Sequence, residues 1–505
     1  MPELSAAIAA DHPLADPAGL RLALTAVDTG NPFKALDALA GWLESLADSQ
    51  AWRPDALFDV LCALDDAARP HLTKLAHDYL GASSLSRGEE RRLALLNIDF
   101  RGLLVARYES CLLRLETGRA QPGMGALAAH LPALVVRLLK AQGAAIRWAR
   151  YRYGAIGGDA WRRLGWAYGI AEREDVAMRE VRLDGDGGAT SPLAEYLRIL
   201  ILATSATDGL NPAEVDLADR LGAWFRPHFR FVRESGADSV YWVDLAQPLP
   251  PTRLAQEPAA APTLRFFSPG DALAALQSFT AQAEQGRLPP ALDLGPGNGV
   301  ERLLPVLRHL AMHWAPVPPL RAQQRHRVHA RMAVVVGWDA CSQVFSGASD
   351  EVLDRAASWV VEDISLGGCG ASVSGWDDGL RAGSLVGMLP EEGGAWLLGV
   401  VRRFRRESDT VASVGVQTLS RNVKPVALRP LGGKHYGVVV PEPALWLRDG
   451  SRGNEARFVV RAGAFADGEA LETVIQGARV VLEPVGRDEA GRGYAVVRYR
   501  AHRAA

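Results

Sequence analysis

The feature that most constrains the fold of this chain is a change in hydrophobic periodicity near residue 229. Before that point, apolar residues recur at three- and four-residue steps, which predicts amphipathic helices. After it, apolar and polar residues alternate in short runs that Gly and Pro separate, which predicts strands. Because helices come first and strands follow, the sequence predicts a multidomain α+β protein.

Residues 1–228 are predicted to form a helical bundle or an irregular α-solenoid, since no fixed-period repeat identifies a repeat family. Asp or Ser before several of the helical segments, and Gly or Pro after them, supply caps and stops. Helices are predicted over residues 19–27, 32–47, 54–80, 88–116, 124–142 and 160–168.

Three further segments complete the predicted organisation. Residues 229–314 are expected to form a small α/β connector, and residues 315–423 an antiparallel β-barrel. Residues 424–505 are expected to form a C-terminal β-module whose Gly-rich connections fit a barrel or a sandwich. Strands of the first barrel are predicted near residues 331–337, 358–364, 369–374, 384–389, 395–405 and 410–418.

Arginine is concentrated just ahead of the predicted barrel. The chain has 505 residues and a net charge of −2, yet the segment 302–338 contains no Asp or Glu. Guanidinium groups pair bidentately with phosphate and stack flat on nucleobases, so such a segment suits a small phosphorylated ligand. Its arginines are Arg302, Arg308, Arg321, Arg325, Arg327 and Arg331.

A second polar motif follows at the end of a predicted strand, in the stretch Asp363-Ile-Ser365-Leu-Gly-Gly368. Asp363 and Ser365 are two residues apart on an extended segment and therefore share one face. A carboxylate can accept hydrogen bonds from N1–H and N2–H of guanine, and a hydroxyl can add a second contact. The two glycines allow the backbone to turn close to a ligand.

An R-x-x-x-R pair followed by D-x-S-x-x-G resembles the PilZ domain, the bacterial receptor module for cyclic di-GMP. The resemblance extends over residues 321–419, with Gly415-Val416 in the closing strand. It implies a β-barrel that binds cyclic di-GMP at the joint between linker and barrel. The ligand-binding residues that it implies are Arg321, Arg325, Arg327, Asp363, Ser365 and Gly368. Three registers of the arginine pair stay open, namely Arg321 with Arg325, Gln323 with Arg327, and Arg327 with Arg331.

Two alternatives compete with the receptor hypothesis. The first is a structural or adaptor protein whose PilZ-like barrel no longer binds ligand, an alternative that the imperfect arginine register favours. The second is an S-adenosylmethionine-dependent methyltransferase, because the stretch 292–299 places Gly295, Gly297 and Gly299 in one loop. The methyltransferase alternative also requires an acidic residue after the loop to hold the ribose hydroxyls of the cofactor. The segment 302–338 contains no such residue.

The remaining expectations concern the cell biology of a receptor without catalysis. Four cysteines in no framework spacing, a first segment without a basic region and no apolar run long enough for a bilayer predict a cytoplasmic protein. We expect no cofactor and no metal site, no nucleic-acid or membrane partner, and an unidentified protein partner. Ligand binding is expected to order residues 320–331 and to reorient the domains, which alters that protein interaction.

Overall fold

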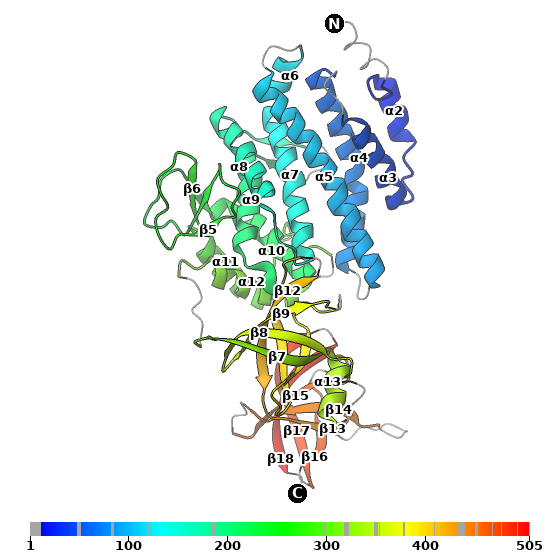
Figure 1. Ribbon diagram of the computed structural model, residues 1–505, viewed down its shortest axis with the longest axis vertical. Coiled ribbons are helices and arrows are strands. Elements are labelled where there is room, and N and C mark those ends of the chain that lie inside the picture. The colour runs from blue at the N-terminus through cyan, green and yellow to red at the C-terminus, as the bar shows by residue number, and fades with distance from the viewer. Residues whose placement is uncertain are drawn as a thin grey trace. The chain divides into compact units, whose positions relative to one another are not determined.

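The structure, a computed structural model, forms two compact units (Figure 1). The first unit comprises residues 1–207 and 212–319, and the second comprises residues 208–211 and 320–505. The four predicted segments divide the chain more finely, and that division stays a prediction. The residues described are 12–47, 52–81, 85–118, 122–183, 188–296, 298–317, 323–347, 352, 354–376, 379–408, 410–431, 440–449, 453–466, 468–475, 477–491 and 493–503.

The first unit is mainly helical, and several helices begin at caps that the sequence encodes. At the start of α5, Ser86 and Glu89 each accept a hydrogen bond from the other's backbone N–H, which forms a capping box. The helices are α2 (Pro17–Thr25), α3 (Pro32–Ser45), α4 (Pro54–Gly81), α5 (Arg87–Thr117), α6 (Met124–Ala129), α7 (Leu131–Tyr151), α8 (Gly158–Arg173), α9 (Pro192–Thr204), α10 (Pro212–Phe225), α11 (Ala272–Glu284) and α12 (Val300–Trp314), with short 3₁₀ turns η1 (Thr207–Gly209) and η2 (Arg226–His228).

The predicted helices are present, with one correction. The segment 124–142, predicted as one helix, is broken at His130 into α6 and α7, because Pro132 starts a new helix in its first turn. Helices α9 and α10 had not been assigned from the sequence. Ser191 caps α9 directly before Pro192, a start signal that the sequence does carry.

The connector contains an antiparallel sheet with the strand order β3-β6-β4-β5. Its strands are β3 (Arg230–Val232), β4 (Tyr241–Asp244), β5 (Thr252–Arg253) and β6 (Leu264–Ser268), and a separate two-stranded ladder pairs β1 (Val181–Arg182) with β2 (Ala189–Thr190). Arg253 donates to the main-chain oxygens of His313 (2.8 Å) and Ala315 (3.0 Å). These bonds fasten the end of α12 to the sheet.

The second unit begins with a closed antiparallel barrel, as predicted. Around the barrel the strand order is β7-β8-β9-β12-β11-β10, with β10 closing onto β7. One short helix, α13 (Trp338–Phe345), follows the first strand and was not predicted. The strands are β7 (His326–Val336), β8 (Ala357–Ser365), β9 (Gly368–Ser374), β10 (Leu385–Pro390), β11 (Leu397–Arg406) and β12 (Val411–Ser420).

The C-terminal module is a second closed antiparallel barrel. Its order is β13-β14-β15-β18-β17-β16, with β16 closing onto β13, so its strands connect in the same order as those of the first barrel. This observation confirms the predicted α+β class and decides between barrel and sandwich. The strands are β13 (Val423–Pro430), β14 (Glu442–Leu447), β15 (Glu455–Arg461), β16 (Leu471–Ile475), β17 (Ala478–Gly491) and β18 (Tyr494–Arg503).

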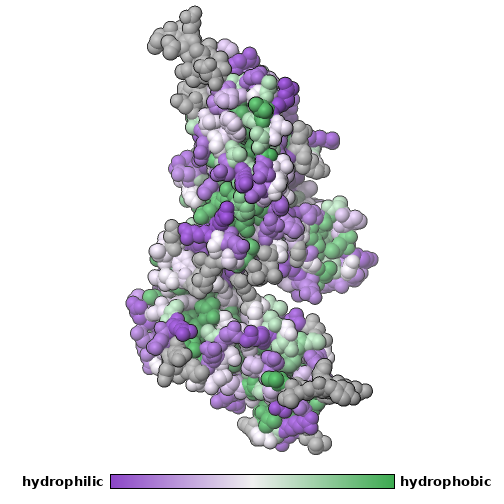
Figure 2. Space-filling model, turned by 90° about the vertical axis from the view of Figure 1, so that its right-hand side faces the viewer, coloured by the Kyte–Doolittle hydropathy of each residue, from purple (hydrophilic) through white to green (hydrophobic). Residues whose placement is uncertain are grey.

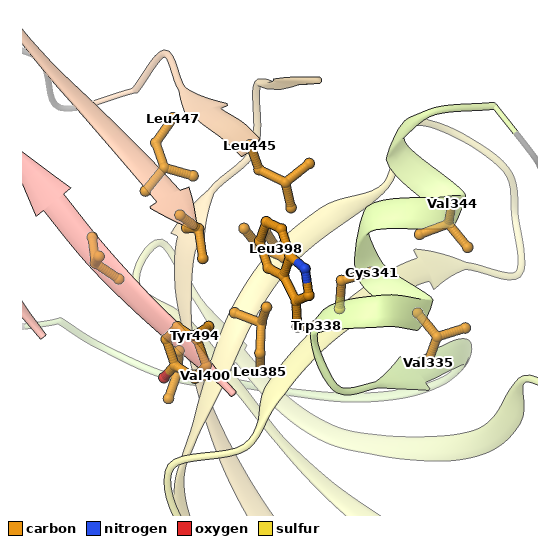
Figure 3. Close-up of a cluster of buried hydrophobic side chains, with 12 residues drawn as sticks. Val335, Trp338, Cys341, Val344, Leu385, Leu398, Val400, Leu445, Leu447 and Tyr494 are labelled. Carbon is orange, nitrogen blue, oxygen red and sulfur yellow. The ribbon is translucent and has the colours of Figure 1, made fainter. Parts of the chain in front are cut away.

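The two barrels share one hydrophobic core, shown in Figure 3. Trp338 and Cys341 of α13 pack with Leu398 of the first barrel and with Leu445 and Tyr494 of the second. Arg402 forms a bidentate ion pair with Glu489 of β17, in which Nη1 and Nη2 donate to the two carboxylate oxygens at 2.7 and 2.6 Å. The barrels therefore form a single packed body.

The surface of the molecule is a mixture of polar and apolar residues. The face in Figure 2 is mostly hydrophilic, with smaller hydrophobic areas between the polar ones. Scattered exposed apolar residues are normal for folded proteins. Across the described residues, no helix combines the length and the apolar composition that crossing a bilayer requires.

Candidate functional site

The candidate site lies on the wall of the first barrel, where β7 begins and β8 ends. Arg325 Nη1 donates to Asp363 Oδ1 at 2.6 Å, and the two side chains are 25% and 29% exposed. The structure thus brings together one arginine of the first motif and the acid of the second, and their contact with a ligand stays a prediction. An ion pair of this exposure contributes on the order of 1 kcal/mol or less, so a ligand can displace it.

Asp363 is part of a straight row of residues that crosses five strands. In the register of the barrel, Arg327 of β7 is paired with Asp363, Asp363 with Gly370, Gly370 with Gly415, and Gly415 with Arg403 of β11. Directly paired residues point to the same face of a sheet. Arg327 and Arg403 are exposed, so this face is the outside of the barrel. We call these five residues the glycine row.

The two glycines put no side chain between the charged ends of the row; Gly370 is partly exposed, and Gly415 is buried. A Cβ at Gly370 would come within 2.9 Å of Asp363 Oδ1, so the glycine makes room for the carboxylate. A Cβ at Gly415 would lie 3.4 Å from Arg403 Nε, so the Arg403 side chain leans over this glycine. The side chain of Arg403 would therefore have to move for a flat ring to lie on both glycines, which we call the bare strip.

The two ends of the glycine row carry cations, Arg327 and Arg403, that no acid among the described residues occupies. Within the described residues, neither Arg327 nor Arg403 has an ion-pair or hydrogen-bond partner. The neighbouring Arg402 donates to Glu489 instead, next to an irregularity of the β11–β12 ladder between Val401 and Arg403. The row therefore presents an acid, bare backbone and two available guanidinium groups.

Ser365 and Gly368 shape the β8–β9 turn. The Ser365 hydroxyl donates to the Gly368 carbonyl oxygen at 3.2 Å. Gly368 has φ of +156°, and a Cβ there would collide with the carbonyl oxygen of Val416 on β12. The geometry gives Gly368 a packing role between β9 and β12, and direct contact of Ser365 and Gly368 with a ligand stays a prediction.

A further cation stands at this turn, and the sequence analysis had not selected it. Arg421, directly before the second barrel, donates from Nη2 to the carbonyl oxygen of Leu366 at 3.2 Å. Gln323 approaches from the other side, since a Cβ at Gly367 would lie 3.4 Å from its Oε1. Both side chains border the turn that carries the second motif.

The structure distinguishes among the possible registers of the R-x-x-x-R arginine pair. Arg325 contacts Asp363, and Arg327 is its cross-strand neighbour, whereas Arg331 donates to Ser358 Oγ at 3.3 Å further along β7. Arg321 lies outside the described residues. Residues 326–331 belong to β7 and pair with β8. The expectation that ligand binding orders residues 320–331 stays a prediction.

The glycine-rich loop that suggested a methyltransferase lies in a structural setting unlike that of a nucleotide-binding loop. Residues 291–296 form turns and irregular backbone, with no strand before the loop, and the nearby sheet is antiparallel. Asp293 accepts from the Gly295 backbone N–H at 2.9 Å and pairs with Arg220 of α10. Gly297 lies outside the described residues. The described part of the loop is thus a turn fastened to α10 and lacks the parallel-sheet setting of a nucleotide site.

The pair His309 and His313 has a structural explanation. Their ring centroids are 4.4 Å apart, and His309 Nε2 lies 2.7 Å from the carbonyl oxygen of Ser205. Burial, with a smaller effect of His309, lowers the pKa of His313 to about 4. Among the described residues there is no group of three or more potential metal ligands.

Comparison with known proteins identifies a relationship in the helical region. Residues 18–235 match a family described as "Cyclic-di-GMP receptor FimW, N-terminal domain". The matched segment runs from α2 to β3 and ends before the first barrel. No curated protein matches the chain.

Proposed function

We propose that this protein is a receptor for cyclic di-GMP and that the first barrel, a PilZ-like domain, binds the ligand on the glycine row. The observation that carries the proposal is the alignment of Asp363, two bare glycines and unpaired arginines on one outer face. The match of residues 18–235 to the N-terminal domain of a cyclic di-GMP receptor supports the same ligand independently of the barrel.

Each part of the row suits one part of the ligand. A guanine can lie flat over Gly370 and Gly415 beneath the Arg403 guanidinium, a stacked arrangement worth about 1–3 kcal/mol per base. Asp363 can accept the two N–H groups that identify guanine. Arg325 and Arg327 can pair with the phosphates, and Arg325 would then exchange its bond to Asp363 for a phosphate bond.

Output would pass through a protein partner and involve no catalysis. We propose that binding reorients the domains on either side of residues 318–322, the segment just before Arg325 and Arg327, and so changes that interaction. The free state of Cys62, Cys111, Cys341 and Cys369 supports a reducing compartment, and we place the protein in the cytoplasm. Solution scattering with and without cyclic di-GMP tests the reorientation, and identical curves would contradict it.

Isothermal titration of the full chain with cyclic di-GMP tests the site, with GTP and cyclic AMP as specificity controls. Asp363→Ala and Arg327→Ala should each weaken binding by about 2–4 kcal/mol, because each leaves a desolvated ligand group unpaired. Arg331→Ala is the matched control, since it removes the same charge from the same strand beside Ser358. Equal binding by all three variants would refute the site.

One observation favours the adaptor alternative. Arg325 and Asp363 already satisfy each other, so the barrel can keep its shape without a ligand. Under that alternative, wild-type protein would not bind cyclic di-GMP, and Asp363→Ala would change only stability, by about 1 kcal/mol or less.

A further inference from the structure

A cavity of about 260 Å³ lies inside the helical unit, among α4, α5, α7, α9 and α10. Its wall is strongly cationic. On α7, Arg137, Lys140 and Arg147 follow one another at three- and seven-residue steps and so share a face of the helix. The six cationic side chains in the lining are Arg69, Arg101, Arg137, Lys140, Arg147 and Arg198.

The acids around the cavity are fewer than the cations and are already engaged. Asp65 and Asp66 both bind Arg137, at 2.9 Å each, and Asp66 also contacts Arg69. A single acid, Asp219, is shared by Arg147 and Arg198. Burial would raise the pKa of Asp219, but these two cations outweigh it and lower that pKa.

Glu195, the remaining acid in the cavity lining, does not neutralise the excess positive charge. Glu195 accepts a hydrogen bond from the Thr190 hydroxyl at 2.7 Å and is buried. Among the described residues, three carboxylates line the cavity and Asp66 lies beside it, so four acids face six cations, of which Arg69 and Lys140 make further contacts. The excess positive charge is what an anion-binding site requires.

Arg101 of α5 is a cation of the cavity lining that has no ion-pair partner among the described residues. Its Nε is inaccessible to solvent and has no hydrogen-bond partner, and the side chain makes no ion pair within the described part of the chain. Burial, together with the nearby charge of Arg147, lowers the pKa of Arg101 to about 10. Arg101 as a whole is partly buried, and a guanidinium that loses water without gaining a counter-charge destabilises a fold, so proteins normally pair such groups.

The other walls of the cavity are apolar and limit its size. Leu72, Leu104 and Ile199 line it, and Gly143 lets α7 approach α9, since a Cβ there would come within 2.9 Å of Ile199. Pockets for drug-sized ligands measure roughly 300–1,000 Å³. This cavity is slightly smaller, so it suits a ligand well below a cyclic dinucleotide in size.

We propose that the helical unit binds a small phosphorylated ligand, a phosphate monoester or diphosphate, whose phosphate pairs with Arg101, Arg147 and Arg198. The apolar wall formed by Leu72, Leu104 and Ile199 would receive the rest of the ligand. This site is separate from the glycine row, which lies on another unit of the chain. The protein would then sense two ligands, and its response to cyclic di-GMP could depend on the second.

Thermal melting of the full chain tests the proposal, with inorganic pyrophosphate and GMP as probes and sodium chloride at matched ionic strength. Arg101→Met removes the charge and keeps a long side chain. Arg91→Met is the control, because Arg91 is exposed on the same helix. At least one probe should raise the melting temperature of wild type and of Arg91→Met by several degrees and leave Arg101→Met unchanged.

Two further readouts separate this site from an incidental effect. Without probe, Arg101→Met should melt above wild type, because it removes an unpaired, partly desolvated cation. Its affinity for cyclic di-GMP should equal that of wild type. If Arg101→Met does not fold, Arg101→Lys, which keeps the charge, should bind the active probe at least fivefold more weakly than wild type. No shift with either probe in wild type, or equal shifts in all variants, would overturn the proposal.

Discussion

Filling the bare strip of the glycine row should block ligand binding without harming the barrel. In Gly415→Val, the new Cβ meets only the flexible Arg403 side chain, at 3.4–3.5 Å, which is ordinary van der Waals contact. Val also favours strands over Gly, so stability should stay unchanged or rise by up to about 1 kcal/mol. A base stacked on the strip contributes about 1–3 kcal/mol. Affinity for cyclic di-GMP should therefore fall roughly 5- to 150-fold.

The control for Gly415→Val is Ser413→Val, two residues earlier on β12 and outside the glycine row. Neither variant should melt below wild type in calorimetry, and Ser413→Val alone should keep wild-type affinity in isothermal titration. If Gly415→Val melts normally and binds as tightly as wild type, the ligand does not lie on the strip. If Ser413→Val is equally impaired, the contact surface is broader than the row.

Three other substitutions test packing and pH dependence. Gly368→Ala should destabilise the first barrel by about 1–3 kcal/mol, because its Cβ collides with the Val416 carbonyl; a wild-type melting temperature would refute that packing role. Trp338→Ala should cost about 3–5 kcal/mol in urea unfolding and lower the stability of both barrels together, and loss confined to one barrel would argue against a shared core. His313 stays neutral when folded, because its pKa is lowered from 6.5 to about 4, so its contribution is present above pH 6.5 and is lost as pH falls toward 4. Melting of His313→Leu should accordingly depend less on pH over that range, and an unchanged pH dependence would show that other groups dominate.

The sequence was sufficient to predict the helical region and the first barrel. The hydrophobic periodicities of helices and strands differ, and the helices and strands here have ordinary lengths. The pairing of Arg325 with Asp363 was not predicted, because the sequence shows two charged motifs about 38 residues apart but not the register between their strands. Helix α13 escaped prediction because it has eight residues between two strands. Its apolar residues, Trp338, Cys341 and Val344, give too short a pattern to distinguish it from a turn.

Other features depend on register and on packing between distant segments. Arg403 aligns with Gly415 only through an irregularity in the β11–β12 ladder, and the side-chain pattern of an isolated strand does not reveal such a shift. Arg101 becomes an unpaired cation only once α5 packs beside α7 and Arg147. In the sequence it is one arginine among many on an amphipathic helix.

The shared core of the two barrels has a consequence for synthesis on the ribosome. Trp338, Leu398 and the rest of the first barrel's half of this core are translated well before Leu445 and Tyr494, which cover them. At about 5–20 residues per second, the last of these partners emerges several seconds after β12 is complete. During that interval the first barrel exposes an aggregation-prone apolar surface. A chain that terminates near residue 420 should therefore aggregate or stay bound to chaperones. Slow codons in the stretch that encodes residues 421–496 would lengthen the same vulnerable period.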